Sequence, residues 1–289
     1  MINRLALGTV HFGMQYGVSN IGGQVDLKNA GMILKYARDT GINTLDTAIV
    51  YGESEQNLGA LGVEDWNVIS KLPKLSCSQE NVTDIVNDFV IGSLERLRIP
   101  KLHGLLLHNS NDLLGPHSKS LYQAVSELKR RGLIEKFGVS VYDPQDLEKI
   151  LSIYPLDIVQ APFNVLDRRL ATSGWLARLH YMNIEIHIRS VFLQGLLLME
   201  HTKRPVFFKR WDSLWKTWHD WLYDEGLSPL QACLGFVNSY SEVNKIIVGV
   251  NSVKQLKQIN VALGLDNVLP PETLISQDVG LINPSNWNL

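Results

Sequence analysis

The stretch FGVSVYDPQDLEKILSIYPLDIVQA, residues 137–161, holds the pattern that decides the fold of this chain. It begins and ends with short apolar runs, Phe137–Ser140 and Ile158–Ala161, each as long as a buried strand. Between them, Asp143-Pro144 places a capping side chain before a proline at the first position of a predicted helix. A strand, a helix and a second strand in this order are typical of a parallel sheet covered by helices.

The same alternation continues in both directions along the chain. Helical periodicity appears at Lys28–Asp39 and Val82–Leu97, and Ser228-Pro229 is a second capped helix start. Eight strand-helix units without a long interruption predict an α/β fold, a single (β/α)8 barrel over residues 1–289, with its active site at the C-terminal ends of the strands. The predicted strands are Leu5–Gly8, Asn43–Asp46, Asn67–Lys71, Gly104–His108, Phe137–Ser140, Ile158–Ala161, Glu185–Ser190 and Lys245–Gly249.

One connection is longer than the rest and runs from Val191 to about Leu227. Its four tryptophans, at positions 211, 215, 218 and 221, recur at helical spacing, so we expect one helical face packed on the barrel. The alternative is that one or two of the indoles wall a substrate cleft, as residues of long loops often do. The C-terminal segment 270–289 is likewise expected either to fold over the cleft or to cover the barrel.

Composition excludes several classes of protein. Hydrophobic residues make up 45% of the chain and charged residues 19%, which is ordinary for a globular protein with a sizeable core. A formal net charge of −2 gives no electrostatic footprint for nucleic acid or an anionic membrane surface. Cys77 and Cys233 form no disulfide framework or metal cluster, so reduced thiols are expected. Because there is no signal-like apolar segment and no G-x-G-x-x-G fingerprint, we expect a cytoplasmic protein without a Rossmann domain.

Four polar residues lie at, or just past, the ends of successive apolar runs: Asp46, Tyr51, Lys71 and His108. Each one alone is usually a cap, a packed ring or a satisfied core edge. An acid, a phenol, an amine and an imidazole at three consecutive strand ends together indicate a proton-transfer site. His103 and His108 are five apart in one strand and point to opposite faces, so we predict no metal.

The segment LDTAIVYGESE, residues 45–55, resembles the D-T-A-x-x-Y-G-x-S-E motif of the aldo-keto reductases, and Lys71 and Leu106-Leu107-His108 match that family's strand-end lysine and L-L-H strand. The resemblance extends from Leu7-Gly8-Thr9 to Gln255-Leu256. It implies reduction of an aldehyde or ketone by a nicotinamide cofactor, with Tyr51 as the general acid. In this interpretation Lys71 lowers the pKa of Tyr51, Asp46 keeps Lys71 charged, and His108 orients the carbonyl oxygen.

The resemblance also implies residues that hold the nicotinamide. Residues 137–141 are similar to the family's G-V-S-N strand end, with Ser140 as a carboxamide contact and Val141 in the place of the asparagine. Gln160 matches the strand-six glutamine on the other side of the carboxamide. Gly8 and Thr9 after the first strand belong to the same cofactor set.

Two further segments extend the implied cofactor site. After strand seven, Arg189 occupies a position where many members have an aromatic ring that stacks on the nicotinamide, and a planar guanidinium can also stack. Ser190 and the backbone of Leu193 and Gly195 would approach the pyrophosphate.

After strand eight, the turn from Gly249 to Gln255 resembles the family's G-x-x-x-x-x-Q-L segment. Members that select NADP usually place Arg or Lys at the positions of Gly249, Asn251 or Gln255, and none of these is cationic here. Lys254 is the neighbouring substitute. Family habit implies NADP, with NAD or dual use as the alternative.

Substrate identity is weakly encoded. Phe12, Met14 and Asn109 are candidate cleft residues, and a sugar-derived carbonyl is one expected substrate class. The expected partner is a small-molecule carbonyl compound, with no nucleic acid and no membrane, and the expected state is a monomer or weak homo-oligomer. The alternative function is that of a cofactor-binding sensor that acts through a protein partner, as potassium-channel beta subunits resembling this family do.

Overall fold

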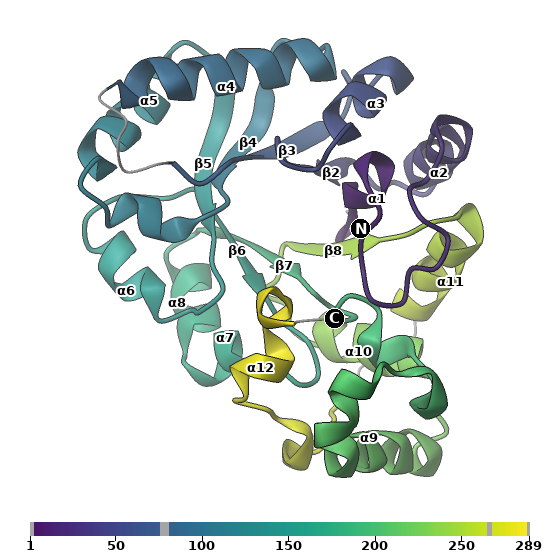
Figure 1. Cartoon of the computed structure of the whole chain (residues 1–289). Coiled ribbons are helices and arrows are strands. Elements are labelled where there is room, and N and C mark those ends of the chain that lie inside the picture. The colour runs from purple at the N-terminus through teal and green to yellow at the C-terminus, as the bar shows by residue number, and fades with distance from the viewer. Residues whose placement is uncertain (1–2, 76–80, 265–267, 288–289) are drawn as a thin grey trace.

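Eight parallel strands close into a barrel in the computed structural model, which describes residues 3–75, 81–264 and 268–287. Each strand pairs with its neighbour in the sequence, and the last pairs with the first, so the predicted (β/α)8 barrel is confirmed (Figure 1). The strands are β1 (Leu5–Gly8), β2 (Thr44–Asp46), β3 (Asn67–Leu72), β4 (Leu102–Leu107), β5 (Ile134–Ser140), β6 (Ile158–Pro162), β7 (Glu185–Arg189) and β8 (Lys245–Gly249).

Helices surround the barrel, and a group of short helical turns follows β7 (Figure 1). The described α-helices are α1 (Val10–Gly13), α2 (Leu27–Asp39), α3 (Ser54–Leu61), α4 (Val82–Leu97), α5 (Ser118–Arg130), α6 (Asp146–Leu151), α7 (Arg169–Thr172), α8 (Trp175–Tyr181), α9 (Asp212–Asp224), α10 (Pro229–Asn238), α11 (Val253–Leu263) and α12 (Val279–Ile282). The described 3-10 turns are η1 (Ser110–Leu113), η2 (Leu196–Leu198), η3 (His201–Lys203), η4 (Val206–Trp211), η5 (Glu272–Leu274) and η6 (Pro284–Asn286).

The strands are apolar on both faces because both faces are covered. β1, β4 and β6 are buried along almost their whole length, as expected for strands of a parallel barrel. Ile69, Leu106 and Ile158 form a small separate cluster, whereas the main core joins the strands to the surrounding helices. This packing leaves the polar strand ends as the place where chemistry can occur.

The two predicted helix starts differ in outcome. Ser228 caps α10 with a full capping box to Gln231, as its sequence pattern predicts. The helix start predicted at Asp143-Pro144 is wrong by two residues, since α6 begins at Asp146. The carboxylate of Asp143 accepts a hydrogen bond from the backbone N–H of Gln145, 3.0 Å away, and so forms a turn that precedes the helix.

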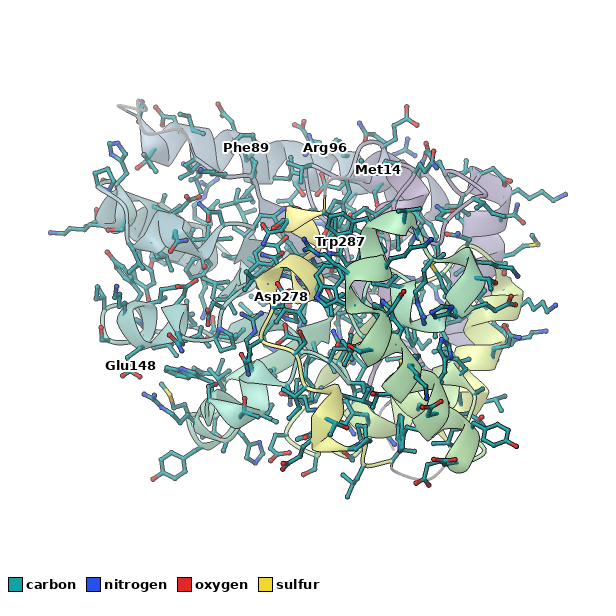
Figure 2. All side chains as sticks on the ribbon, turned by 60° about the horizontal axis from the view of Figure 1, so that its bottom comes forward. Met14, Phe89, Arg96, Glu148, Asp278 and Trp287 are labelled. Atoms are coloured by element: carbon teal, nitrogen blue, oxygen red, sulfur yellow. The ribbon has the colours of Figure 1, made fainter. Side chains whose placement is uncertain are left out.

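The tryptophan-rich segment packs rather than lining the cleft. Trp215 and Trp218 are fully buried on α9, and Trp211 and Trp221 pack against the core around them. The C-terminal segment docks on the same region: the indole of Trp287 meets Phe208 edge-on, and Asp278 accepts a hydrogen bond from Trp211. Figure 2 shows Asp278 and Trp287 beside this helical segment. The described part of the tail therefore packs on the helical segment that follows β7.

Cys233 is a free, buried thiol on α10, and burial raises its pKa. Cys77 lies outside the described residues. Among the described helices, none is both long enough and apolar enough to span a bilayer.

Candidate active site

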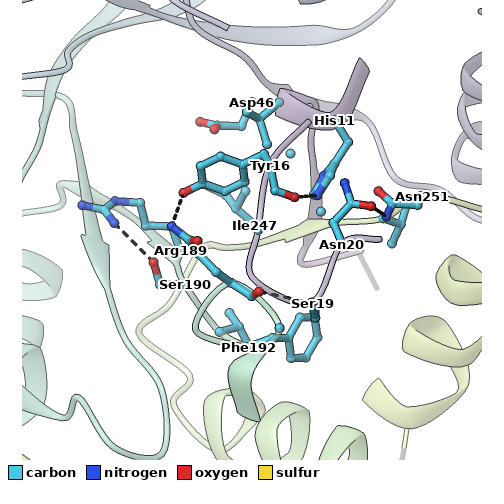
Figure 3. Close-up of a pocket in the computed structure, with 18 of the residues that line it drawn as sticks. His11, Tyr16, Ser19, Asn20, Asp46, Arg189, Ser190, Phe192, Ile247 and Asn251 are labelled. Carbon is cyan, nitrogen blue, oxygen red and sulfur yellow. Dashed lines mark hydrogen bonds between the residues drawn. The ribbon is translucent and has the colours of Figure 1, made fainter. Parts of the chain in front are cut away.

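A cavity of about 720 Å³ lies at the C-terminal ends of the strands (Figure 3). Its walls come from the ends of β1, β2 and β4 to β8 and from the loops that follow them. The sequence-predicted residues that line it are Gly8, Thr9, Asp46, Tyr51, His108, Ser140, Gln160, Arg189, Ser190, Gly195, Gly249, Asn251 and Gln255. The structure thus brings together side chains that are more than 200 positions apart in the sequence.

Lys71 and Asp46 form a buried ion pair at the cavity wall, which Asp46 lines and Lys71 does not. The Lys71 ammonium is 2.6 Å from Oδ1 of Asp46 and also donates to the backbone carbonyl of Thr47 at 3.0 Å. Lys71 is 1% exposed, and its Nζ lies 5.3 Å from the centroid of the Tyr51 ring. Because β2 and β3 are parallel neighbours, their ends deliver the acid and the amine to the same level of the barrel.

The loop after β2 fixes the phenol above this pair. The backbone N–H of Tyr51 donates to the carbonyl of Ala48, and its own carbonyl accepts from Ser54. Gly52 has a φ of +55°, in the left-handed region that favours glycine. At Gly13, a Cβ atom would fall 1.8 Å from the Tyr51 carbonyl oxygen, so only glycine allows α1 to pack so closely on this loop.

The electrostatics of Tyr51 differ from the sequence expectation. We expected Lys71 to lower the pKa of Tyr51, but burial raises it and the Asp46 carboxylate adds to the rise. Arg189 is the cation that opposes this shift, because the charge of Lys71 is compensated by Asp46 at 2.6 Å. Burial also lowers the pKa of Lys71, against the effect of Asp46. Tyr51 therefore stays a protonated phenol, which is the form that donates a proton.

His108 presents a neutral imidazole to the same space. Its ring meets the Tyr51 ring edge-on, with centroids 5.8 Å apart. Burial, followed by the charges of Lys71 and Arg189, lowers the pKa of His108 to about 4, while Asp46 acts in the opposite direction. A neutral imidazole carries one N–H, which can donate a hydrogen bond to a carbonyl oxygen.

Gln160 and Ser140 connect the implied cofactor site to the ion pair. The side-chain amide of Gln160 donates to Oδ2 of Asp46 at 2.7 Å, and its oxygen accepts from the Ser140 hydroxyl at 3.2 Å. Both side chains are almost fully buried. A group bound beside Ser140 and Gln160 would therefore touch the hydrogen-bond network that holds Asp46 in place.

The segment after β7 has an unusual backbone. Ser190, Leu193, Gln194 and Gly195 all have positive φ values, between 48° and 86°. Such conformations cost about 1–3 kcal/mol each for residues other than glycine and cluster at functional sites. At Gly195 a Cβ atom would fall 1.8 Å from the hydroxyl of Ser19, so the glycine is needed for contact with another loop.

That other loop, residues 16–20, crosses the cavity and was missed by the sequence analysis (Figure 3). The hydroxyl of Tyr16 accepts a hydrogen bond from Gln194 at 3.0 Å, and the carbonyl of Tyr16 lies 3.0 Å from the His11 ring. Asn251 donates to the side chain of Asn20 at 3.0 Å. No sequence pattern marks these residues, because their contacts are to loops of distant strands.

Besides Lys71, four predicted residues do not line the cavity. Phe12 is a wrong prediction, since it is 0% exposed and belongs to the core. Met14 points outward and is 40% exposed, and the Asn109 amide donates to Asp112 at 2.6 Å. Leu193 is fully buried.

The rest of the LDTAIVYGESE motif is structural. The hydroxyl of Ser54 donates to the carbonyl of Thr9 at 2.9 Å and lies 3.1 Å from the hydroxyl of Thr47. Glu55 is 2% exposed and accepts hydrogen bonds from Ser70 and Ser93, each at 2.6 Å. Its second oxygen accepts from Arg96 at 2.8 Å; Figure 2 labels Arg96 on α4. Glu55 thus ties α3 to β3 and α4.

We expect Glu55→Ala to lower the free energy of unfolding by about 3 kcal/mol, because it leaves two buried hydroxyls without their acceptor. Urea denaturation of the purified variant measures this change. Glu64→Ala, at an exposed glutamate, is the matched control and is expected to stay within about 0.5 kcal/mol of the wild type. A loss below about 1 kcal/mol in Glu55→Ala would show that the carboxylate is not a structural tie.

The cavity suits a ligand that is rich in donors and acceptors. Two polar atoms of its lining residues, Oδ1 of Asn251 and Nδ1 of His11, are buried without a hydrogen-bond partner. Buried polar atoms are rarely left unpaired, so these two atoms are consistent with a site for a polar cofactor. Among the described residues, no group of three or more His, Cys, Asp or Glu side chains is placed to hold a metal ion.

Comparison with known proteins is consistent with this geometry. The sequence model of the Aldo/keto reductase family matches residues 4–274 of the chain. The D-arabinose 1-dehydrogenase of Saccharomyces cerevisiae is 31% identical over 119 residues, which are 38% of this chain and 36% of that enzyme. The aflatoxin B1 aldehyde reductase member 2 of Rattus norvegicus is 24% identical over 303 residues, which cover 90% of this chain and 82% of the rat protein. The chain thus spans about a third of the yeast enzyme and most of the rat protein.

A solved structure shares the architecture. The holo form of an aldo-keto reductase from Bacillus halodurans superposes with a TM-score of 0.73 at 20% sequence identity. The match covers 93% of this chain and 89% of that chain. At this identity the likeness shows the fold.

Proposed function

The chain belongs to the aldo/keto reductase family, whose members are NAD(P)-dependent oxidoreductases that act on carbonyl groups, and on this premise we propose that it interconverts an aldehyde or ketone and the corresponding alcohol. The observation that carries the proposal is the buried Lys71–Asp46 pair directly below Tyr51, with His108 edge-on to the phenol at the cavity. A bound nicotinamide would supply the hydride, which no side chain can provide.

The side chains then supply the proton that the substrate oxygen requires. Tyr51 donates its hydroxyl proton to the substrate oxygen, on which negative charge develops. An alkoxide is a stronger base than a phenolate, so this transfer is downhill although burial raises the pKa of Tyr51. His108 donates its N–H to the same oxygen, and Lys71 offsets the charge of Asp46, which would otherwise disfavour the phenolate that remains. Asp46 and Gln160 hold Lys71 in position through the hydrogen bonds described above.

The complete set of four residues favours catalysis over cofactor sensing alone. Binding a cofactor does not require a buried amine beneath a phenol. For the substrate, we propose a sugar-derived carbonyl as the first class to test. The support is that the yeast relative is a D-arabinose 1-dehydrogenase, and that Tyr16 at the cavity carries a hydroxyl that can pair with substrate hydroxyls.

The test is an assay of NADH and NADPH oxidation by the full chain across sugar aldehydes, simple aldehydes and ketones, with cofactor binding measured in parallel. We expect turnover with at least one carbonyl class. Tight cofactor binding without turnover of any class would refute the enzymatic proposal and favour the sensor function.

The cofactor site bears on the choice between NADP and NAD. Family habit implies NADP, but the residues that line the cavity after β8 and on α11 are uncharged, among them Asn251, Gln255 and Gln258. Lys254 is exposed and does not line the cavity. We therefore propose dual use, with NADH bound about as tightly as NADPH.

We expect the dissociation constants of NADH and NADPH to agree within about threefold. The described cavity wall after β8 and on α11 has no cation that could pair with a 2′-phosphate. Gln255→Arg is expected to tighten NADPH binding about tenfold, with little change for NADH, and the gain should shrink as salt rises. Fluorescence titration measures all four constants. A wild type that binds NADPH tenfold more tightly, and loses this preference in Lys254→Met, would show that Lys254 binds the phosphate.

A further inference from the structure

Arg189 is a charged group on the cavity wall that has no ion-pair partner among the described residues. The other charged lining residue, Asp46, is neutralised by Lys71 at 2.6 Å. Arg189 instead uses its N–H groups on neutral acceptors: the carbonyl of Val141 at 3.1 Å and the hydroxyls of Ser140 and Ser190 at 3.4 and 3.3 Å. The site therefore carries one uncompensated positive charge.

This charge is fixed in place. The guanidinium carbon lies 4.4 Å from the centroid of the Tyr142 ring, so the group stacks on an aromatic side chain while hydrogen bonds hold three of its nitrogens. A guanidinium held by these contacts is not free to move toward a substrate. It is well suited to place a charge at a constant position.

The charge of Arg189 also acts on the titratable residues of the proposed active site. Arg189 contributes to lowering the pKa values of Lys71 and His108, and it opposes the rise in the pKa of Tyr51. Arg189 is partly buried, so solvent screens its charge less than that of a surface arginine. Ser140 and Ser190, its hydrogen-bond partners, are residues that the family resemblance assigns to the cofactor site.

A nicotinamide ring is cationic when oxidised and neutral when reduced. We propose that Arg189 makes this site bind the reduced cofactor more tightly than the oxidised cofactor, an inference that rests on the proposed function. A fixed cation repels the oxidised ring and has no comparable effect on the neutral ring. Repulsion of the oxidised product hastens its release after reduction, a step that limits the rate of many enzymes. Arg189 would thus bias the site toward reduction.

The experiment measures dissociation constants for the oxidised and reduced forms of the better-bound cofactor by quenching of tryptophan fluorescence, without substrate. We expect Arg189→Gln to lower the ratio of oxidised to reduced constants about tenfold, which is about 30 mV for a two-electron couple. Arg189→Lys keeps the charge and should retain most of the ratio. Arg178→Gln is the matched control, because Arg178 also stacks on an aromatic ring, Trp175, at 3.8 Å but does not line the cavity.

The outcomes separate this inference from the proposed function. Cofactor binding with the same ratio in the wild type and Arg189→Gln would overturn the inference and leave the proposed function standing. An unchanged ratio with a raised KM for carboxylate-bearing carbonyls would also overturn it and assign Arg189 to substrate anions. No binding of either form by the wild type would refute both. Arg189→Met, which keeps the apolar stem, gives the same test if Arg189→Gln does not fold.

Discussion

Replacement of Tyr51 by phenylalanine is expected to lower the rate of carbonyl reduction by about 10²–10⁴-fold, the usual range for loss of a general acid. The change removes only a hydroxyl, and the ring remains in edge-on contact with His108. Cofactor affinity should stay within about threefold of the wild type, because no cofactor contact is assigned to this hydroxyl. Single-turnover reduction of the best substrate from the carbonyl panel measures the chemical step directly.

A control for this variant comes from the same cavity. Tyr16→Phe also deletes one phenolic hydroxyl, whose partner is Gln194 rather than the ion pair. We expect it to change KM more than the single-turnover rate, because Tyr16 is 41% exposed and its hydroxyl contacts a loop residue. Reduction by Tyr51→Phe at a rate close to that of the wild type would exclude Tyr51 as the acid.

The strands and the placement of Asp46, Tyr51, Lys71 and His108 near one another were predictable because local sequence determines both. A parallel barrel strand is buried on both faces, so it appears as a short apolar run such as Leu102–Leu107. The first polar residue after the apolar residues Gly104–Leu107 is His108, which lies next to the strand end and is delivered to the C-terminal edge. The backbone N–H of His108 donates to the carbonyl of Leu72, which places it beside the end of the neighbouring strand.

The loop residues of the site could not be predicted in the same way. Tyr16 and Asn20 reach the cavity because Gln194 and Asn251, on loops of distant strands, bind them. Such contacts leave no periodic pattern in the sequence. The prediction that Phe12 lines the cavity was wrong for a related reason. A position just after a strand does not determine whether the side chain points to the cavity or to the core. The short helix α1 buries Phe12 completely.

The raised pKa of Tyr51 could not be predicted from the sequence either. Sequence order indicates which charges meet, but the sign of a shift depends on burial and on how completely those charges cancel. Lys71 and Asp46 lie 2.6 Å apart, and at Tyr51 the loss of hydration and the charge of Asp46 both raise the pKa. The amine and the carboxylate therefore have to be considered as one unit.

Lys71→Met is expected to reduce the single-turnover rate by about 10²–10³-fold. It removes the cation that stabilises the phenolate and leaves the Asp46 carboxylate uncompensated, which raises the pKa of Tyr51 further. The unpaired buried carboxylate should also cost about 3–5 kcal/mol of stability, so thermal unfolding is measured beside the kinetics. Asp46→Asn is expected to lower the rate by only about tenfold. The variant frees Lys71 from its position, but it also removes the anion that disfavours the phenolate.

The double variant Asp46→Asn/Lys71→Met distinguishes a coupled pair from two separate contributors. Independent residues would give multiplied losses, whereas members of one unit give losses that do not add. We expect the double variant to be no slower than Lys71→Met and more stable than it, because the second change removes the unpaired buried carboxylate. Tyr51→Phe/Lys71→Met should likewise be little slower than Tyr51→Phe, since Lys71 acts through the phenol. Multiplied rate losses in both double variants would mean that Lys71 and Asp46 act independently of Tyr51, and the assigned mechanism would then be wrong.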